Sequence, residues 1–427
     1  MVTIFFSLFL ILAVITILGI ESANLNTNEN VNSLIQAYNM PKLQYYFFLN
    51  TLSNVNSLTI SNSTYGIVYS TLQKVYLNEL QNINVSAVSL NTSNIVMQLP
   101  KKPTNIISYI PVTIFNLQNQ ATPYPFQQMV NANYSVYGNY SNAELSNIEF
   151  FYFNGTVIPS WLESNTGQYA VWWIKVGSIP ASSSFTVYMG FARKNVSLFN
   201  KVTIGEAPEL SPGYGEYDDG ANVFYAYFNA NTPKSDFNLN SAISFSTTTY
   251  KGTKAIQLTG VTDTRNGVMT YEKPLPNQAY LEFAYFAAPS TSDNNAEPSV
   301  GLGNSETATS INYYDGDAPS STGSFGVQGF SDGSWSDNSV GTGTTQWQID
   351  NFTYVPASSN VNGCEISPQV YCDTYTNELT SQSTLYLSFF YADADGVQLD
   401  ALYNWVFVSS YPPNGIMPTV GFGSDLP

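Results

Sequence analysis

Short runs of β-branched and aromatic residues, separated by turn residues, make up most of the chain from residue 104 onward. The densest block lies around residues 145–191, where the run FFYF at 150–153 leads into the turn Asn154-Gly155. Further along, VWWIKV at 171–176 and FTVYMGF at 185–191 flank a loop of small residues. Such runs, bounded by Gly, Pro, Asn and Ser, are typical of β-strands. The pattern therefore predicts an all-β protein.

Two consecutive β-sandwich domains are predicted from the spacing of these runs. Residues 104–203 form the first sandwich, which opens with strands at 107–115 and 129–136. Residues 204–427 form a second domain of the jelly-roll type, because many short strands alternate there with loops rich in Gly, Ser and Asp. Its expected strands are 222–228, 255–258, 279–287, 299–302, 325–330, 347–355, 384–391, 401–409 and 419–422.

The N-terminal residues follow a different pattern. Ile4–Ile20 is a 17-residue segment without a charge. It is longer than the core of most signal peptides and close to the roughly 20 residues that span a bilayer. Residues 1–23 are therefore either a signal peptide or an uncleaved membrane anchor, and the rest of the chain is expected outside the membrane. Residues 24–103 are rich in Asn, Leu and Tyr and predict a partly helical stalk or linker.

Charge narrows the choice of partners and of environment. Residues 1–273 carry 14 acidic and 13 basic residues, whereas the chain after Lys273 has 16 acidic residues and no Lys, Arg or His. Nucleic-acid binding is not expected, because contacts to phosphates need cations. The unpaired carboxylates of the C-terminal half would repel one another at neutral pH. Wide spacing on the surface, bound divalent cations or an acidic medium, as around an acidophile, would each relieve this repulsion.

Three parts of the sequence resemble unannotated cell-surface proteins of archaea. The stretches 110–130, 150–164 and 171–192 resemble a β-sandwich domain of unassigned function, and GEAPELSPGYGEYDDGANVF at 205–224 resembles the connector that follows it. The segment LYNWVFVSSYPPNGIMPTVGFGS at 402–424 is similar to the closing strands of a lectin-like, concanavalin-type jelly roll. The resemblance implies two sandwiches and a surface location, and it implies no activity.

No catalytic residue is predicted. A serine triad needs a histidine, and the chain has none. A retaining glycosidase needs two facing carboxylates, and the acidic strand motif of jelly-roll glucanases is absent. The loop YADADGVQLD offers Asp393, Asp395 and Asp400 as candidate calcium ligands, although these aspartates also fit a solvated hairpin turn. No other cofactor is expected.

A glycan-binding site is predicted around Trp335, because a tryptophan in a polar loop offers a ring for stacking on a sugar. Asp332 and Asp337 flank it, and Tyr313 and Tyr314 are the next candidates. Trp335 folded back over the sandwich edge is the alternative interpretation. The other tryptophans of the apolar runs, Trp161, Trp172, Trp173 and Trp405, are predicted to lie in the core.

The chain has two cysteines, Cys364 and Cys372, which are predicted to form a disulfide in an oxidising exterior. Candidate glycosylation sites are Asn62, Asn84, Asn91, Asn133, Asn139, Asn154, Asn195 and Asn351. Together these features predict an exported surface protein that acts in adhesion, glycan binding or the envelope, with surface glycans or envelope proteins as partners. A structural subunit of a surface layer or filament, and an extracellular carbohydrate hydrolase, are the two alternatives.

Overall fold

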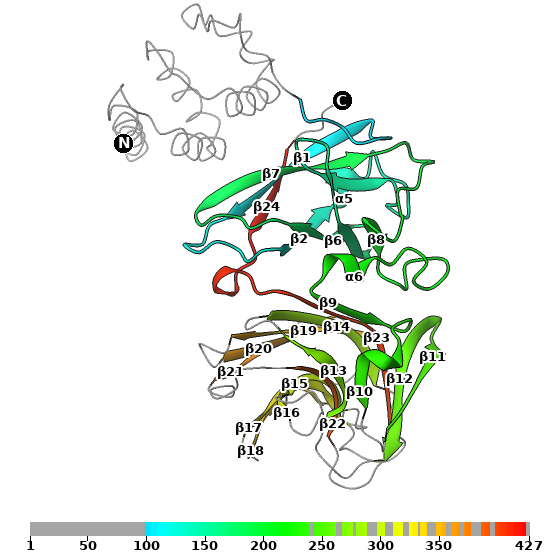
Figure 1. The fold of residues 1–427 in the computed structure, drawn as a ribbon, viewed down its shortest axis with the longest axis vertical. Helices are drawn as coiled ribbons and strands as arrows, with labels where there is room; N and C mark the ends of the chain where they lie inside the picture. Colours follow the sequence, from blue (N-terminus) through cyan, green and yellow to red (C-terminus); the bar gives the residue numbers. More distant parts are fainter. Residues whose placement is uncertain are drawn as a thin grey trace, which may run out of the picture. The chain divides into compact units, whose positions relative to one another are not determined.

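The computed structural model describes residues 99–423, except for 240–242, 262–266, 276–278, 288–296, 304–310, 319–323, 332–333, 340–346, 356–359, 368–370, 377–385 and 393–397. The described residues form four β-sheets (Figure 1). The helices among them are short: α5 (Tyr134–Tyr137) and α6 (Gly220–Val223) have four residues each. The predicted all-β fold class is therefore confirmed.

The first sandwich consists of a five-stranded and a four-stranded sheet. The five-stranded sheet has the order β24-β1-β7-β3-β4 and the four-stranded sheet the order β2-β6-β5-β8. Their bounds are β1 Ser108–Asn116, β2 Phe126–Asn133, β3 Ile148–Phe151, β4 Val157–Ile158, β5 Ser160–Asn165, β6 Tyr169–Val176, β7 Ser183–Phe191, β8 Ile204–Glu206 and β24 Thr419–Phe422. The strands are antiparallel, apart from the parallel pair β5 and β8.

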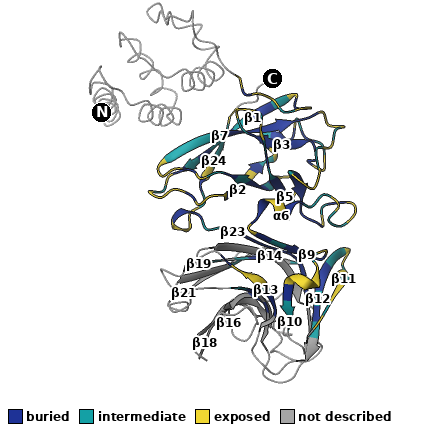
Figure 2. Ribbon diagram, in the orientation of Figure 1, coloured by how far each residue is buried: buried dark blue, intermediate teal, exposed yellow. Residues whose placement is uncertain are grey.

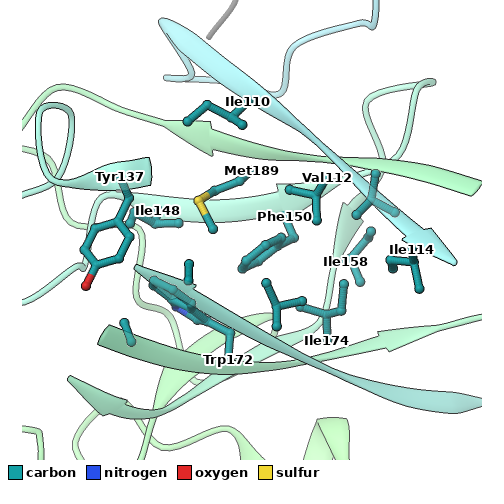
Figure 3. Packing of buried hydrophobic residues seen from close by; sticks show 14 of the residues in the cluster. Ile110, Val112, Ile114, Tyr137, Ile148, Phe150, Ile158, Trp172, Ile174 and Met189 are labelled. Atoms are coloured by element: carbon teal, nitrogen blue, oxygen red, sulfur yellow. The ribbon is translucent and has the colours of Figure 1, made fainter. Parts of the chain in front are cut away.

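The core of this sandwich fills the space between its two sheets. Figure 3 shows Trp172 of β6 beside Phe150 of β3 and Met189 of β7, with Ile174 further along β6. The strand residues around this core are buried (Figure 2). β6 is buried on both faces, because Trp172 points into this core while Trp173 belongs to a second cluster. This explains why VWWIKV is an almost continuous apolar run.

The second sandwich packs a seven-stranded sheet against an eight-stranded one. The first has the order β10-β13-β22-β15-β16-β17-β18, and the second has the order β11-β12-β23-β14-β19-β20-β21 with β9 also paired to β23. Phe389 of β22 meets Tyr403 of β23 edge to face across the two sheets, with ring centroids 5.0 Å apart. The bounds are β9 Ala226–Asn229, β10 Phe237–Leu239, β11 Ile243–Tyr250, β12 Thr253–Val261, β13 Gly267–Pro274, β14 Ala279–Ala287, β15 Glu297–Gly303, β16 Ile311–Ala318, β17 Ser324–Ser331, β18 Ser334–Ser339, β19 Gln348–Val355, β20 Asn360–Ser367, β21 Tyr371–Thr376, β22 Tyr386–Ala392 and β23 Gln398–Ser410. Two 3₁₀ turns complete the list, η2 Lys234–Asp236 and η3 Pro413–Gly415.

The last described strand belongs to the first sandwich and not to the second. β24 pairs with β1 in the register Val112↔Phe422 to Phe115↔Thr419. The sequence predicts this strand correctly but places it in the second domain. Its side chains explain the difference, because Val420 and Phe422 pack against the core of the first sandwich. The second sandwich is thus inserted between β8 and β24 of the first.

Two predicted strands have other bounds than expected: β2 lies three residues earlier and β9 is shorter. The expected strand 129–136 ends at Asn133, whose side-chain oxygen accepts a hydrogen bond from Ser135 N at 2.9 Å and caps α5. The expected strand 222–228 begins only at Ala226, because α6 precedes it. The cap at Asn133 and the helix α6 leave the local apolar pattern unchanged. The strand bounds could therefore not be predicted from that pattern.

The predicted signal or anchor and most of the predicted stalk fall on residues 1–98, outside the described residues. Within residues 99–423, no described helix is long and apolar enough to cross a membrane.

Candidate functional site

The segment that leads from β8 to β9 carries two buried carboxyl groups, those of Glu206 and Asp219. We call residues 206–219 the acidic connector. Its acids are Glu206, Glu209, Glu216, Asp218 and Asp219. Tryptophans from both sandwiches donate to it: Trp161 Nε1 of β5 to Asp218 Oδ1 at 2.9 Å, and Trp405 Nε1 of β23 to Glu209 Oε1 at 3.1 Å.

Asp218 is the most fully bonded of these acids. Besides Trp161, three donors reach its two oxygens, namely Gly220 N at 3.0 Å, the Tyr227 hydroxyl at 2.8 Å and the Asn229 side-chain amide. Burial raises the pKa of its carboxyl, and the four hydrogen bonds oppose that shift. The side chain of Asp218 therefore accepts hydrogen bonds from both sandwiches, from β5 of the first and from β9 of the second.

Glu206 and Asp219 are almost completely buried, with 3% and 2% of their surface exposed. Glu206 Oε1 accepts from Ser211 Oγ at 2.7 Å, whereas neither oxygen of Asp219 has a hydrogen-bond partner. Burial raises the pKa of Glu206 to about 7, and burial together with the neighbouring Asp218 raises the pKa of Asp219 to about 8. Both groups therefore favour the protonated form up to neutral pH.

An aromatic cluster lies beside the acidic connector. The rings of Phe224 and Phe407 stack with centroids 3.9 Å apart, and Trp161 and Trp405 meet edge to face at 5.4 Å. Trp173 also contacts Phe407 at 5.1 Å, and its indole donates to Glu163 Oε2 at 2.6 Å. The prediction that Trp161, Trp172, Trp173 and Trp405 lie in the core is confirmed, because each is at most 3% exposed.

This geometry fits a structural junction and not a catalytic centre. A catalytic carboxyl must reach its substrate, and Glu206 and Asp219 are enclosed by protein. Among the described residues, no group of three or more His, Cys, Asp or Glu has the arrangement that holds a metal ion. The connector is hydrogen-bonded to both sandwiches through Asp218 and Glu209.

The predicted glycan-binding residues converge in the register of β16, β17 and β18. Tyr314 lies opposite Gln328, which lies opposite Asp337, so these three residues form a row across the strands. Trp335 is two residues before Asp337 on β18 and therefore occupies the same face of the sheet.

Tyr313 occupies the opposite face. The buried Val300 lies opposite Asp315, Asp315 opposite Val327 and Val327 opposite Asn338, and Tyr313 shares the face of Asp315. By register, Tyr313 is therefore on the same face of the seven-stranded sheet as the buried Val300. The register separates Tyr313 from Trp335, Tyr314 and Asp337, which stay together.

The comparisons with known proteins point to a viral family. No protein-family model matches the chain. The chain is 30% identical, over 396 residues, to uncharacterized protein 562 of Sulfolobus islandicus rod-shaped virus 1, covering 86% of this chain and 68% of that protein. The chain belongs to the protein 562 family. The sequence resemblance had pointed to archaeal surface proteins, and the relative found is encoded by a virus.

Solved structures similar to this member of the protein 562 family are β-rich proteins of several kinds. A basic winged bean lectin with Tn-antigen has a TM-score of 0.28 at 14% identity, covering 44% of this chain and 99% of the lectin. The CBM2 module of the evolved Dit of Lactobacillus casei BL23 phage J-1 has a TM-score of 0.31 at 7% identity, covering 44% and 96%. Alginate lyase A1-II' has a TM-score of 0.28 at 10% identity, covering 40% and 84%.

The other residues predicted for this protein 562 family member are spread over the fold. Asp400 lies in β23 opposite Thr259, while Asp332, Asp393 and Asp395 fall outside the described residues. The calcium site therefore stays a prediction. Cys364 of β20 lies directly opposite Cys372 of β21, and Cys364 takes part in a disulfide bond.

Among the glycosylation candidates, Asn139, Asn154 and Asn195 are exposed. Asn133 caps α5 and Asn351 is half-buried in β19. Asn62, Asn84 and Asn91 lie outside the described residues.

The sequence analysis does not predict the acidic connector as a site. A usable signal was present: five acids occur between Lys201 and Lys234, without a single base among them. In this member of the protein 562 family, that acidic run is the segment that contacts both sandwiches.

Proposed function

We propose that the protein is a non-enzymatic surface component that binds glycans through the face of β16–β18 that carries Tyr314 and Trp335. One observation carries this proposal, the register row Tyr314, Gln328 and Asp337 with Trp335 two residues away on the same face. The opposite face of the same strands continues the buried core side, so this row lies on the outer side of the sheet.

The residue types in this row match the chemistry of a sugar. Aromatic rings stack on the apolar faces of sugar rings, and an amide with a carboxylate supplies both donors and acceptors for hydroxyl groups. Phe330 lies opposite Trp335 and adds a third aromatic residue to the same face. The site is thus defined by Tyr314, Gln328, Trp335 and Asp337, and Tyr313 is no longer part of it.

The proposed location is the outside of a cell or of a virus particle. The predicted N-terminal hydrophobic segment supports export, and the viral relative makes a virion or the envelope of its host a suitable setting. Glycans on that envelope would be the ligands.

A glycan-array screen of the full chain at pH 3 and pH 7, with and without calcium, tests this function. We expect binding to one class of sugar, and we expect Trp335→Ala to reduce that binding at least about tenfold, the loss of roughly one stacking contact. Tyr124→Ala is the matched control, because Tyr124 is 81% exposed on the first sandwich and lies outside the site. Absence of binding in all conditions, or equal loss in both variants, would overturn the proposal.

An assembling subunit is the second candidate, and a specific feature favours it. β11 forms an edge of the eight-stranded sheet, and its sequence ISFSTTTY has no charge to block pairing with another strand. Analytical ultracentrifugation distinguishes the two, since an assembling subunit sediments as polymers and loses them on Thr247→Lys, a change at an exposed position of β11.

The hydrolase alternative gains no support from the described residues. Asp315 lies on the core side of its sheet by register, and Glu206 and Asp219 are buried. Burial keeps Glu206 and Asp219 from reaching a substrate.

A further inference from the structure

The acidic connector is bonded to both sandwiches at once. On the side of the first sandwich, Ala207 N donates to Leu162 O at 2.7 Å and Trp161 donates to Asp218. On the side of the second, the Tyr214 hydroxyl meets both Asn404 O and Asn404 Oδ1 at 2.9 Å. These hydrogen bonds link the two sandwiches only while the connector keeps this conformation.

The carboxyl groups of the connector are bonded to neutral donors and not to cations. Glu206 accepts a hydrogen bond from a serine and Glu209 from a tryptophan. The donors to Asp218 are also uncharged, and Asp219 has no donor. Two lysines of neighbouring strands are bonded to other groups: Lys175 Nζ donates to Asn222 O at 2.8 Å, and Lys254 Nζ donates to Asn231 Oδ1 at 2.7 Å.

The other titratable groups around the connector do not neutralise it either. Those that face it are acids and phenols, apart from the two lysines just named. They are Glu144 before β3, Tyr214 and Tyr217 within the connector, and Tyr227 on β9.

A buried carboxylate without a cation is costly, and several together repel one another. Protonation removes both penalties and turns the carboxyl group into a donor as well as an acceptor. Burial, the first cause of the raised pKa of Glu206 and of Asp219, acts in this direction. The closed junction therefore holds protons that the open connector would release.

We propose that the acidic connector is an acid-closed lock between the two sandwiches. With Glu206 and Asp219 protonated, the connector packs between β5 and β23 and holds the sandwiches as one body. Loss of these protons as the pH rises opens the connector while both β-sandwiches remain folded. The lock is independent of the proposed glycan site.

Hydrogen exchange of the full chain, followed by mass spectrometry between pH 4 and pH 8 and corrected for the intrinsic exchange rate, tests the lock. We expect the protection of peptides from residues 206–224 to fall at least about a hundredfold over this range, because each proton released on opening makes opening about tenfold easier per pH unit. Far-UV circular dichroism should stay unchanged.

Variants assign the effect to the connector. Glu206→Gln combined with Asp219→Asn mimics the protonated state at two of the acids, so its protection should fall at least about tenfold less than that of the parent over the same range. The part of the fall that remains belongs to Glu209, whose pKa burial also raises to about 7. Glu216→Gln is the matched control, since this exposed acid lies on the same segment, and it should behave like the parent. If the double variant fails to fold, Glu206→Gln alone should remove the part of the fall between about pH 4.5 and 7.

Three results would overturn the lock. One is constant protection of residues 206–224 in the parent protein across the pH range. A second is an equal fall in the parent and in the neutralised variant. The third is loss of β-structure in step with connector exchange, which would mean global unfolding.

Discussion

At the scale of single residues, the fold contains a buried acid outside the acidic connector, Glu149, whose pKa is raised like those of Glu206 and Asp219. Glu149 of β3 is 4% exposed, and its Oε1 has no hydrogen-bond partner. Burial raises its pKa to about 7 from the usual value near 4.5. The neutral form is thus favoured in the fold, and its stabilising contribution is complete below about pH 4.5 and is lost as the pH rises through about 7.

Glu149→Gln should flatten part of the dependence of stability on pH. A shift of this size corresponds to a free energy of unfolding on the order of 3 kcal/mol, lost by the parent between pH 4.5 and 7.5 and not by the variant. Chemical denaturation of both proteins at the two pH values measures the difference. Glu272→Gln, a change at an exposed acid of β13, serves as the control, and an identical pH dependence in all three proteins would contradict the prediction.

The residue scale also shows where sequence reasoning ends. Tryptophans in apolar runs are predictable as core residues, because burial follows from the local pattern. Their carboxyl partners are not, since Trp161 meets Asp218 across 57 positions and Trp405 meets Glu209 across 196. Contacts at such separation depend on the path of the whole chain.

At the scale of elements, the predictable strands are those whose sequences are rich in apolar residues. β14 was predicted with its observed bounds, and β6 and β7 to within two residues. β11, β20 and β21 were missed, because Ser, Thr and Asn make up much of their sequences and resemble loops. β11 and β21 are the two edges of the eight-stranded sheet, so their backbones are paired on one side only and their sequences have less need of apolar residues.

The hairpin of β20 and β21 also makes a quantitative prediction. The predicted disulfide between Cys364 and the facing Cys372 would close a short loop, for which chain entropy gives a stabilisation of about 2–3 kcal/mol. Cys364→Ser with Cys372→Ser should lower the free energy of unfolding by that amount. Denaturation with and without reductant measures it, and intact mass after alkylation without reductant shows whether the pair is oxidised. A parent that takes up alkylating reagent at both cysteines would contradict the prediction.

At the scale of the whole molecule, the second sandwich is an insertion in the first. β1 follows the start of the described chain and finds its partner β24 at the end. The four-stranded sheet depends on the same region, since Gln128 Nε2 of β2 donates to Pro418 O at 2.9 Å. Sequence patterns divide the chain at residue 204, because strand periodicity does not reveal which sheet a strand joins.

Removal of the C-terminal strand should therefore destabilise the opposite end of the chain. A protein truncated after Met417 loses the packing of Val420 and Phe422, exposes β1 as an edge and leaves Gln128 without its acceptor. Loss of two partly buried side chains and one buried hydrogen bond costs on the order of 3 kcal/mol. Hydrogen exchange should show faster opening of β1 and β7, and truncation after Gly423 is the control that keeps β24. If β1 keeps its protection in the shorter protein, the two sandwiches are consecutive domains in solution. If β1 loses that protection, the first sandwich needs β24 to be complete, although β24 follows the whole second sandwich in the sequence.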